Sequence, residues 1–243
     1  MSHNLEMQVN RTQAGLYTLT YGLKEAPLDV QEAAFSLNNL STVSPAQLGF
    51  LRAQESKGTF KPYSRTNADI LYDDRNNTVV IVPEGAISKL VGIANLVAAH
   101  KKDQEYVIPK NQRELVYAVV DEMLKNGTAV VANHGELKIN TADFGQTELT
   151  SKLFSDERLG IRAYDYGNWL SKQGRNSQSM FFDSKDRAKS QKSPYTNRLR
   201  VFGPDGDFLV NGYDRFLDGS NGAFGVRFEK AASDMRGELG EPR

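Results

Sequence analysis

Apolar residues recur every three or four positions over much of the first two thirds of the chain, a spacing typical of amphipathic helices. The clearest case follows Asn111, where Leu115, Val119 and Met123 share one face and Gly127 provides a stop. Asn111 and Glu114 there have the spacing of a capping box. Similar patterns predict further helices over residues 28–40, 45–54, 84–100, 147–154, 164–172 and 184–191.

Short alternating or β-rich runs predict the strands. Asn76 and Asn77 lie between two of these runs, and asparagine tolerates the positive φ of a tight hairpin turn. Residues 57–67 have loop character, and 133–135 have the composition of a turn. The strand runs cover residues 16–21, 68–72, 78–82, 128–132, 137–140, 198–202, 208–213 and 223–228.

The order of these elements predicts an α+β fold. A helix-rich N-terminal part with a small sheet precedes a C-terminal region of short antiparallel strands joined by polar turns. One division of the chain places a mixed region at 1–145, a helix followed by antiparallel strands at 146–232, and a frayed tail at 233–243. A single domain is the alternative, because no composition shift marks the boundary.

Composition narrows the range of functions. The chain has 243 residues, with 30 basic residues balanced by 30 acidic ones, so nucleic-acid binding through bulk charge is not expected. The absence of cysteine excludes disulfides, thiolate nucleophiles and iron–sulfur clusters. We see no signal peptide, and the longest apolar stretch, 87–99, is too short to cross a bilayer. We therefore expect a soluble, cytoplasmic protein without membrane contact.

Acidic side chains gather in the C-terminal turns, where oxygen ligands for a hard cation would be close together. Asp205, Asp207 and Asp214 are the candidate metal ligands, with Asn211 and Asp218 nearby. Their spacing does not match an EF-hand loop, and Pro-Asp-Gly and Asp-Gly-Ser-Asn-Gly are also ordinary turn sequences. Turn formation is the simpler interpretation, so we expect no cofactor; calcium is the alternative that the pattern leaves open.

The same region is rich in arginine and tyrosine, which make good recognition surfaces because they offer large contact areas at low entropic cost. The candidate ligand-binding residues are Arg200, Tyr213, Arg215 and Arg227. The competing interpretation is cross-strand pairing, in which arginine stems cover aromatic rings on a half-solvated sheet.

Other candidate residues have plain structural explanations. His134 lies in a turn and has Glu136 as a potential acid–base partner, while His100 falls at the C-terminal end of a predicted helix. Trp169 shares a helical face with Tyr166 and Leu170, which is the spacing of a core contact. Asp183 and Asp186 either form an acid pair or serve the start of the following helix.

Several catalytic motifs are missing from the sequence. It contains no Walker A loop, no Gly-x-Gly-x-x-Gly, no Gly-x-Ser-x-Gly and no His-Glu-x-x-His. Nucleotide hydrolysis and cofactor-dependent redox chemistry are therefore not suggested by any motif.

The segments 199–202, 206–213 and 223–228 resemble the end of C-type-lectin-like domains, more narrowly of formylglycine-generating-enzyme-like domains. Such domains close with a Gly-Val-Arg or Gly-Phe-Arg strand after Asn- and Gly-rich loops, and Gly225-Val226-Arg227 matches that strand. The Gly-Gly-Ser-Trp segment usual upstream is absent, and without cysteine the oxidase chemistry of those enzymes cannot occur. The resemblance implies a binding scaffold that displays variable loops.

Three functional hypotheses follow. The first is a non-catalytic module that binds a protein or carbohydrate with Arg, Tyr and Asp side chains on C-terminal turns. The second is a carboxylate- or metal-dependent hydrolase, a nuclease or a glycosidase, using residues such as Asp183, Asp207 and Asp214. The third is a structural or assembly protein of a virus or phage.

Overall fold

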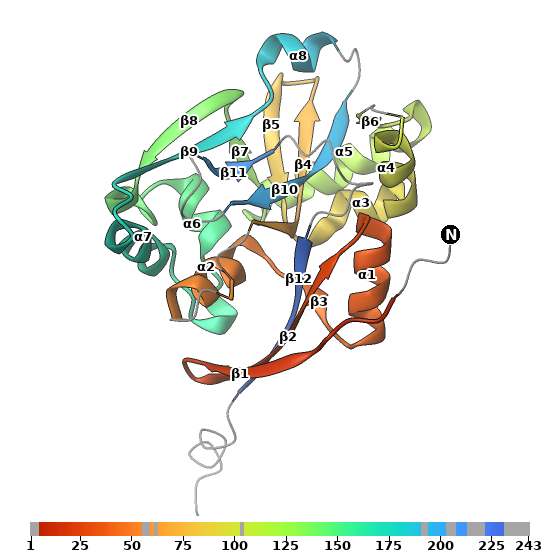
Figure 1. Ribbon diagram of the computed structural model, residues 1–243. Coiled ribbons are helices and arrows are strands. Elements are labelled where there is room, and N and C mark those ends of the chain that lie inside the picture. Colours follow the sequence, from red (N-terminus) through yellow and green to blue (C-terminus); the bar gives the residue numbers. More distant parts are fainter. Residues whose placement is uncertain are drawn as a thin grey trace, which may run out of the picture.

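The computed structural model describes residues 5–54, 59–60, 63–102, 105–190, 194–202, 208–212 and 222–230. Its centre is a mixed sheet with helices on both faces (Figure 1). Helices and strands both contribute substantially, as the predicted α+β class requires. The strands are β1 (Asn10–Ala14), β2 (Tyr17–Glu25), β3 (Ser41–Thr42), β4 (Ser64–Asp73), β5 (Thr78–Val82), β6 (Tyr106–Val107), β7 (Val130–Ala132), β8 (Gly135–Asn140), β9 (Ser177–Phe182), β10 (Tyr195–Val201), β11 (Phe208–Asn211) and β12 (Gly222–Lys230).

The helices match the predicted pattern with small shifts. They are α1 (Leu28–Leu37), α2 (Pro45–Gln54), α3 (Ala86–Val91), α4 (Ile93–His100), α5 (Lys110–Lys125), α6 (Glu148–Phe154), α7 (Ala163–Lys172) and α8 (Lys185–Ser190), with 3₁₀ turns η1 (Pro83–Gly85), η2 (Thr141–Asp143) and η3 (Glu157–Leu159). The single helix predicted over 84–100 is wrong, because Gly92 at φ 87° separates α3 from α4. The capping box at Asn111 is also wrong: Pro109 is the N-cap of α5, and no side chain caps it.

The sheet order is β1-β2-β12-β4-β10-β11-β9-β8, so strands from both ends of the sequence meet at its centre. β12 pairs antiparallel with β2 and touches β4 in parallel, while β11 pairs antiparallel with β10 and parallel with β9. The predicted antiparallel C-terminal region is therefore present in part: β10 and β11 pair antiparallel, whereas the pairings of β11 with β9 and of β12 with β4 are parallel. β-Propensity identified the strands, but their partners lie far away in the sequence, at β2, β4 and β9.

One edge of β4 has two neighbouring strands, which pair with different parts of its length. Ala223 of β12 lies beside Arg65, while β5 pairs only with residues from Asp69 onward. Between these two pairings the backbone N–H of Asn67 donates instead to the carbonyl of Val43, just ahead of α2 (3.0 Å). The sheet therefore divides at Asn67.

β7 and β8 were predicted as strands around one turn, and they do not pair with each other. β7 pairs with β5, and β8 pairs with β9, although Ala132 and Gly135 are only three residues apart. Because these strands lie at opposite edges of the β5-β4-β10-β11-β9 sheet, the sheet must curve back toward itself.

The two larger apolar clusters of the described residues lie on opposite faces of β4, and a smaller one holds Phe35, Leu40 and Ala223. Ala68, Ile70 and Tyr72 pack with α2, α6 and α7, whereas Leu71 packs with α3, α4 and α5. Tyr166 and Leu170 are buried in the first cluster with Trp169 packed against them, as their helical spacing predicted.

Candidate functional site

The predicted ligand-binding residues fall into two groups. Arg200 and Arg227 lie on described strands, whereas Tyr213 and Arg215 lie outside the described residues. The candidate metal ligands Asp205, Asp207 and Asp214 also lie outside them.

Arg200 lies near the end of β10, not on a turn, and only 8% of its surface is exposed. Its guanidinium carbon is 4.9 Å from the ring centre of Tyr63 and 5.3 Å from that of Phe202. The two rings are themselves 6.2 Å apart. This is the arginine-over-aromatic packing that the competing interpretation expected. The expectation that Arg200 points into solvent is wrong, because the strand that carries it runs through the middle of the sheet.

Arg227 is half-buried on β12, opposite Thr20 of β2. Its Nε lies 2.9 Å from the Glu229 carboxylate, which also forms an ion pair with Arg11 at 3.5 Å. Arg227 therefore belongs to a network of partly exposed ion pairs on the β1-β2-β12 ribbon, away from Arg200.

A buried polar network joins α8 to the sheet. Arg187 lies 3.3 Å from the carboxylates of both Glu105 and Asp183. The Tyr195 hydroxyl donates to Asp183 at 2.7 Å, and the Asn197 amide donates to Glu105 at 2.8 Å. Burial raises the pKa of Tyr195 well above its usual value. Asp183 is thus tied to a cation and a phenol, while Asp186 is exposed on α8.

The histidines have structural partners as well. His100 is buried, with its Nε2 3.1 Å from the Asn197 amide oxygen. His134 Nδ1 lies 3.0 Å from the backbone carbonyl of Asp183, and Glu136 accepts a hydrogen bond from Ser179 instead of meeting His134. The acid–base pair suggested by their proximity in sequence is not formed.

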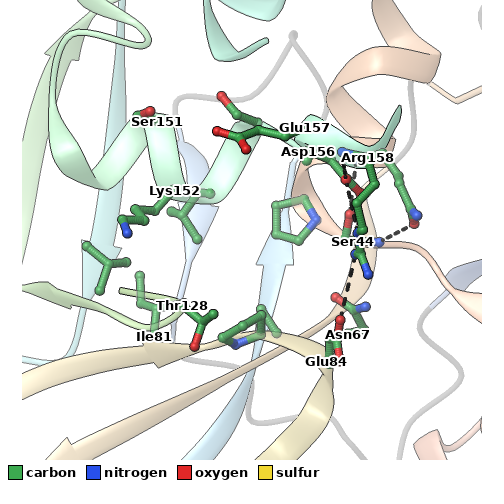
Figure 2. Close-up of a pocket in the computed structure, with 18 of the residues that line it drawn as sticks. Ser44, Asn67, Ile81, Glu84, Thr128, Ser151, Lys152, Asp156, Glu157 and Arg158 are labelled. Carbon is green, nitrogen blue, oxygen red and sulfur yellow. Dashed lines mark hydrogen bonds and ion pairs between the residues drawn. The ribbon is translucent and has the colours of Figure 1, made fainter. Parts of the chain in front are cut away.

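Two adjoining cavities form a two-lobed groove at the division of the sheet, and Figure 2 shows the first of these lobes. The first, amphipathic lobe has a volume of about 570 Å³ and includes the apolar Ile81, Val130 and Leu153. The second, polar lobe has a volume of about 470 Å³ and includes Glu32 and Lys89. The residues that line both lobes are Gln47, Asn67, Glu84 and Arg158.

One wall of the groove is the start of α2. The Ser44 hydroxyl accepts from the N–H of Gln47 (3.1 Å), and the Gln47 amide oxygen accepts from the N–H of Ser44 (3.0 Å). This reciprocal capping box, followed by Pro45 at the first helical position, is the N-terminus that the sequence predicted. It fixes the local geometry of the helix start that forms this wall.

The floor of the polar lobe contains a buried ion pair. Arg198 Nε is 3.2 Å from Asp69 Oδ1, and both side chains are at most 2% exposed. Asp69 also accepts from the N–H of Ser88 at the start of α3 (2.8 Å). Burial raises the pKa of the Asp69 carboxyl even though Arg198 and Ser88 act in the opposite direction. Gly85 packs directly on the guanidinium, where a Cβ atom would lie 2.9 Å from Arg198 Nη2.

The entrance of the groove contains an exposed ion pair. Arg158 Nη2 is 3.7 Å from Glu84 Oε1, with side chains 79% and 64% exposed. Arg158 Nε also lies 3.4 Å from Asp156 Oδ1. Glu84 has φ 61°, the left-handed region that non-glycine residues seldom occupy. Sequence reasoning missed this entrance, because it placed Glu84 in a regular helix and Asn67 in a loop.

The described residues contain neither a cluster suited to a metal ion nor a helix suited to a membrane. No group of three or more His, Asp or Glu side chains there is arranged to hold a metal ion. None of the helices in the same part of the chain has both the length and the apolar character needed to span a membrane.

Comparison with known proteins identifies the fold. No protein-family model matches the chain, and no curated protein matches it either. A solved structure from Nanoarchaeota, described as the accommodation of massive sequence variation by the C-type lectin fold, aligns with a TM-score of 0.54 and 13% identity. The alignment covers 90% of this chain and 100% of the other. The protein has a C-type-lectin-like fold, as the C-terminal resemblance implied.

Proposed function

We propose that this protein is a non-catalytic ligand-binding module that recognises a protein or a carbohydrate with its C-terminal turns. The observation that carries the proposal is the connection of those turns: residues 203–207 join β10 to β11, and 213–221 join β11 to β12. These strands pair with β2, β4 and β9, so each turn begins and ends on the sheet. Binding residues are commonly carried on loops that a rigid scaffold positions.

The lectin-like fold supports this proposal through its neighbour. The nanoarchaeal protein is described as accommodating massive sequence variation on this fold. A scaffold that tolerates varied side chains suits recognition, because loop residues change without altering the core. In this chain Tyr213 and Arg215 supply the contacts, and Arg227 lies on the strand that follows them.

Arg200 has a supporting role in the proposed surface. It packs between Tyr63, which is 37% exposed, and Phe202, which immediately precedes the first turn. Tyr63 then offers an aromatic face beside Phe202, held in place by the guanidinium. Aromatic and cationic groups of this kind bind sugars and protein side chains alike.

The experiment is to probe an oligosaccharide array and a protein array with the purified chain and with Tyr213→Ala/Arg215→Ala. We expect the double variant to lose at least tenfold in signal on the spots that the parent binds, with an unchanged melting temperature. Arg162→Ala is the control, since Arg162 is exposed and pairs only locally with Asp165. Equal binding by the double variant, or a large loss of stability, would contradict the assignment.

A further inference from the structure

Two features of the groove are costly for folding. The Asn67 side-chain oxygen is buried and has no hydrogen-bond donor in the described part of the chain. Glu84 adopts a left-handed conformation, although its carboxylate makes only the long contact to Arg158. Unsatisfied polar atoms and backbone strain concentrate at binding sites, where a ligand makes use of them.

Asn67 and Glu84 lie together on one wall, as Figure 2 shows. Both residues line the two lobes, and the side chains of both carry oxygen atoms that accept hydrogen bonds. An amide oxygen beside a carboxylate suits an ammonium group, which donates up to three hydrogen bonds and carries the opposite charge. In the present structure the cation nearest to the Glu84 carboxylate on this wall is Arg158, whose Nη2 lies 3.7 Å from Glu84 Oε1.

Arg158 is free to exchange partners at low cost. An exposed ion pair at this separation contributes little to folding. Its guanidinium is planar and donates two parallel hydrogen bonds to a carboxylate, a geometry that the present contacts to Glu84 and Asp156 do not use. A ligand carboxylate would give Arg158 a better partner while the ligand ammonium took its place on Glu84.

The remaining surfaces define the rest of the ligand. Ile81, Val130 and Leu153 form an apolar part of the amphipathic lobe, next to the charged entrance. The groove has no excess of positive charge, since Glu32, Glu84, Asp156 and Glu157 balance its Lys and Arg residues. This balance disfavours polyanions such as nucleotides and favours a molecule carrying both signs.

We propose that the groove binds a small zwitterion with an apolar side chain, an α-amino acid or a dipeptide. Its ammonium contacts Glu84 and the Asn67 oxygen, which turns from its buried position into the groove to accept it. Its carboxylate contacts Arg158, and its side chain occupies the apolar part of the amphipathic lobe. The volume of about 570 Å³ lies within the range of small-molecule sites. The site is separate from the C-terminal turns, so it stands or falls independently of the proposed function.

The test is isothermal titration of the purified chain with L-leucine and with L-leucyl-L-leucine. We expect at least one of them to bind, and N-acetyl-L-leucine and L-leucine methyl ester, which each lack one charge, to bind at least tenfold more weakly. Absence of binding by both zwitterions, or equal binding by the singly charged analogues, overturns the proposal.

Variants of the chain locate the site. Arg158→Ala and Glu84→Asn should each weaken binding about tenfold or more, asparagine being tolerant of positive φ. Arg162→Ala should bind as the parent does, because Arg162 is equally exposed but does not line the groove. Arg158 is 79% exposed, so its variant is expected to fold, and unchanged affinity in that variant contradicts the assignment.

Discussion

The groove has two ion pairs of opposite character, one in its floor and one at its entrance. Arg198 and Asp69 are buried and lie 3.2 Å apart; Arg198 also pairs with Glu32, and Asp69 accepts from the N–H of Ser88. Arg158 and Glu84 are exposed, lie 3.7 Å apart and include a residue in strained backbone conformation. Removing one partner of the first pair leaves a buried charge unpaired, whereas the second pair is exposed and contributes little to folding.

The largest expected effect comes from breaking the floor pair. Asp69→Ala leaves a buried guanidinium without its carboxylate and removes the acceptor for Ser88, so we expect a loss of about 3–5 kcal/mol in the free energy of unfolding. Urea denaturation measures this loss.

The double variant Asp69→Leu/Arg198→Met tests whether the loss comes from the unpaired charge. Replacing both partners with apolar residues should recover much of the stability, because burial already raises the pKa of Asp69 and opposes its ionisation. A single variant as stable as the parent would show that the floor and entrance pairs do not differ.

A smaller effect is expected at the glycine that packs on the floor pair. Gly85 and Gly160 both have φ +64°, so alanine at either position should lose about 1–2 kcal/mol from backbone strain. At Gly85 the new Cβ also clashes with the Arg198 guanidinium, which should add about 1–3 kcal/mol to the loss of stability.

Gly160→Ala is the matched control for that comparison, since nothing lies within 4 Å of its added Cβ. Thermal and urea unfolding of the two variants give the difference directly. Equal losses would mean that Arg198 yields to the methyl group and that the floor is less rigid than its contacts indicate.

The same contrast explains what the sequence did and did not reveal. β-Rich runs located β10, β11 and β12, and the Gly225-Val226-Arg227 strand pointed to the correct fold. These are local signals. The burial of Arg200 depends on Tyr63, more than 130 positions earlier, and no local pattern shows that proximity.

The groove is also a product of distant contacts. Asn67 becomes a wall residue because β12 and β5 leave β4 on either side of it, a consequence of sheet pairing alone. Pro83-Glu84-Gly85 was the one local signal, because a proline and a glycine flanking one residue favour a turn. The helical spacing of apolar residues after Glu84 nevertheless led to the prediction of a helix that begins at Glu84.

The smallest expected effect lies at the entrance and has the opposite sign. Glu84→Gly relieves the left-handed strain, offset in part by the flexibility of glycine in the unfolded chain, so we expect a gain of about 0.5–1 kcal/mol in stability. Glu84→Gln is the control: it removes the charge but keeps the strain, and its stability should stay within about 0.5 kcal/mol of the parent. Urea denaturation of both variants separates the two contributions.

A gain in stability with glycine alone would mean that the chain retains a strained glutamate at a cost to folding, as expected where a carboxylate is kept for a ligand. If glycine instead destabilises the chain, the Glu84 side chain supports the fold, and the distinction between floor and entrance fails.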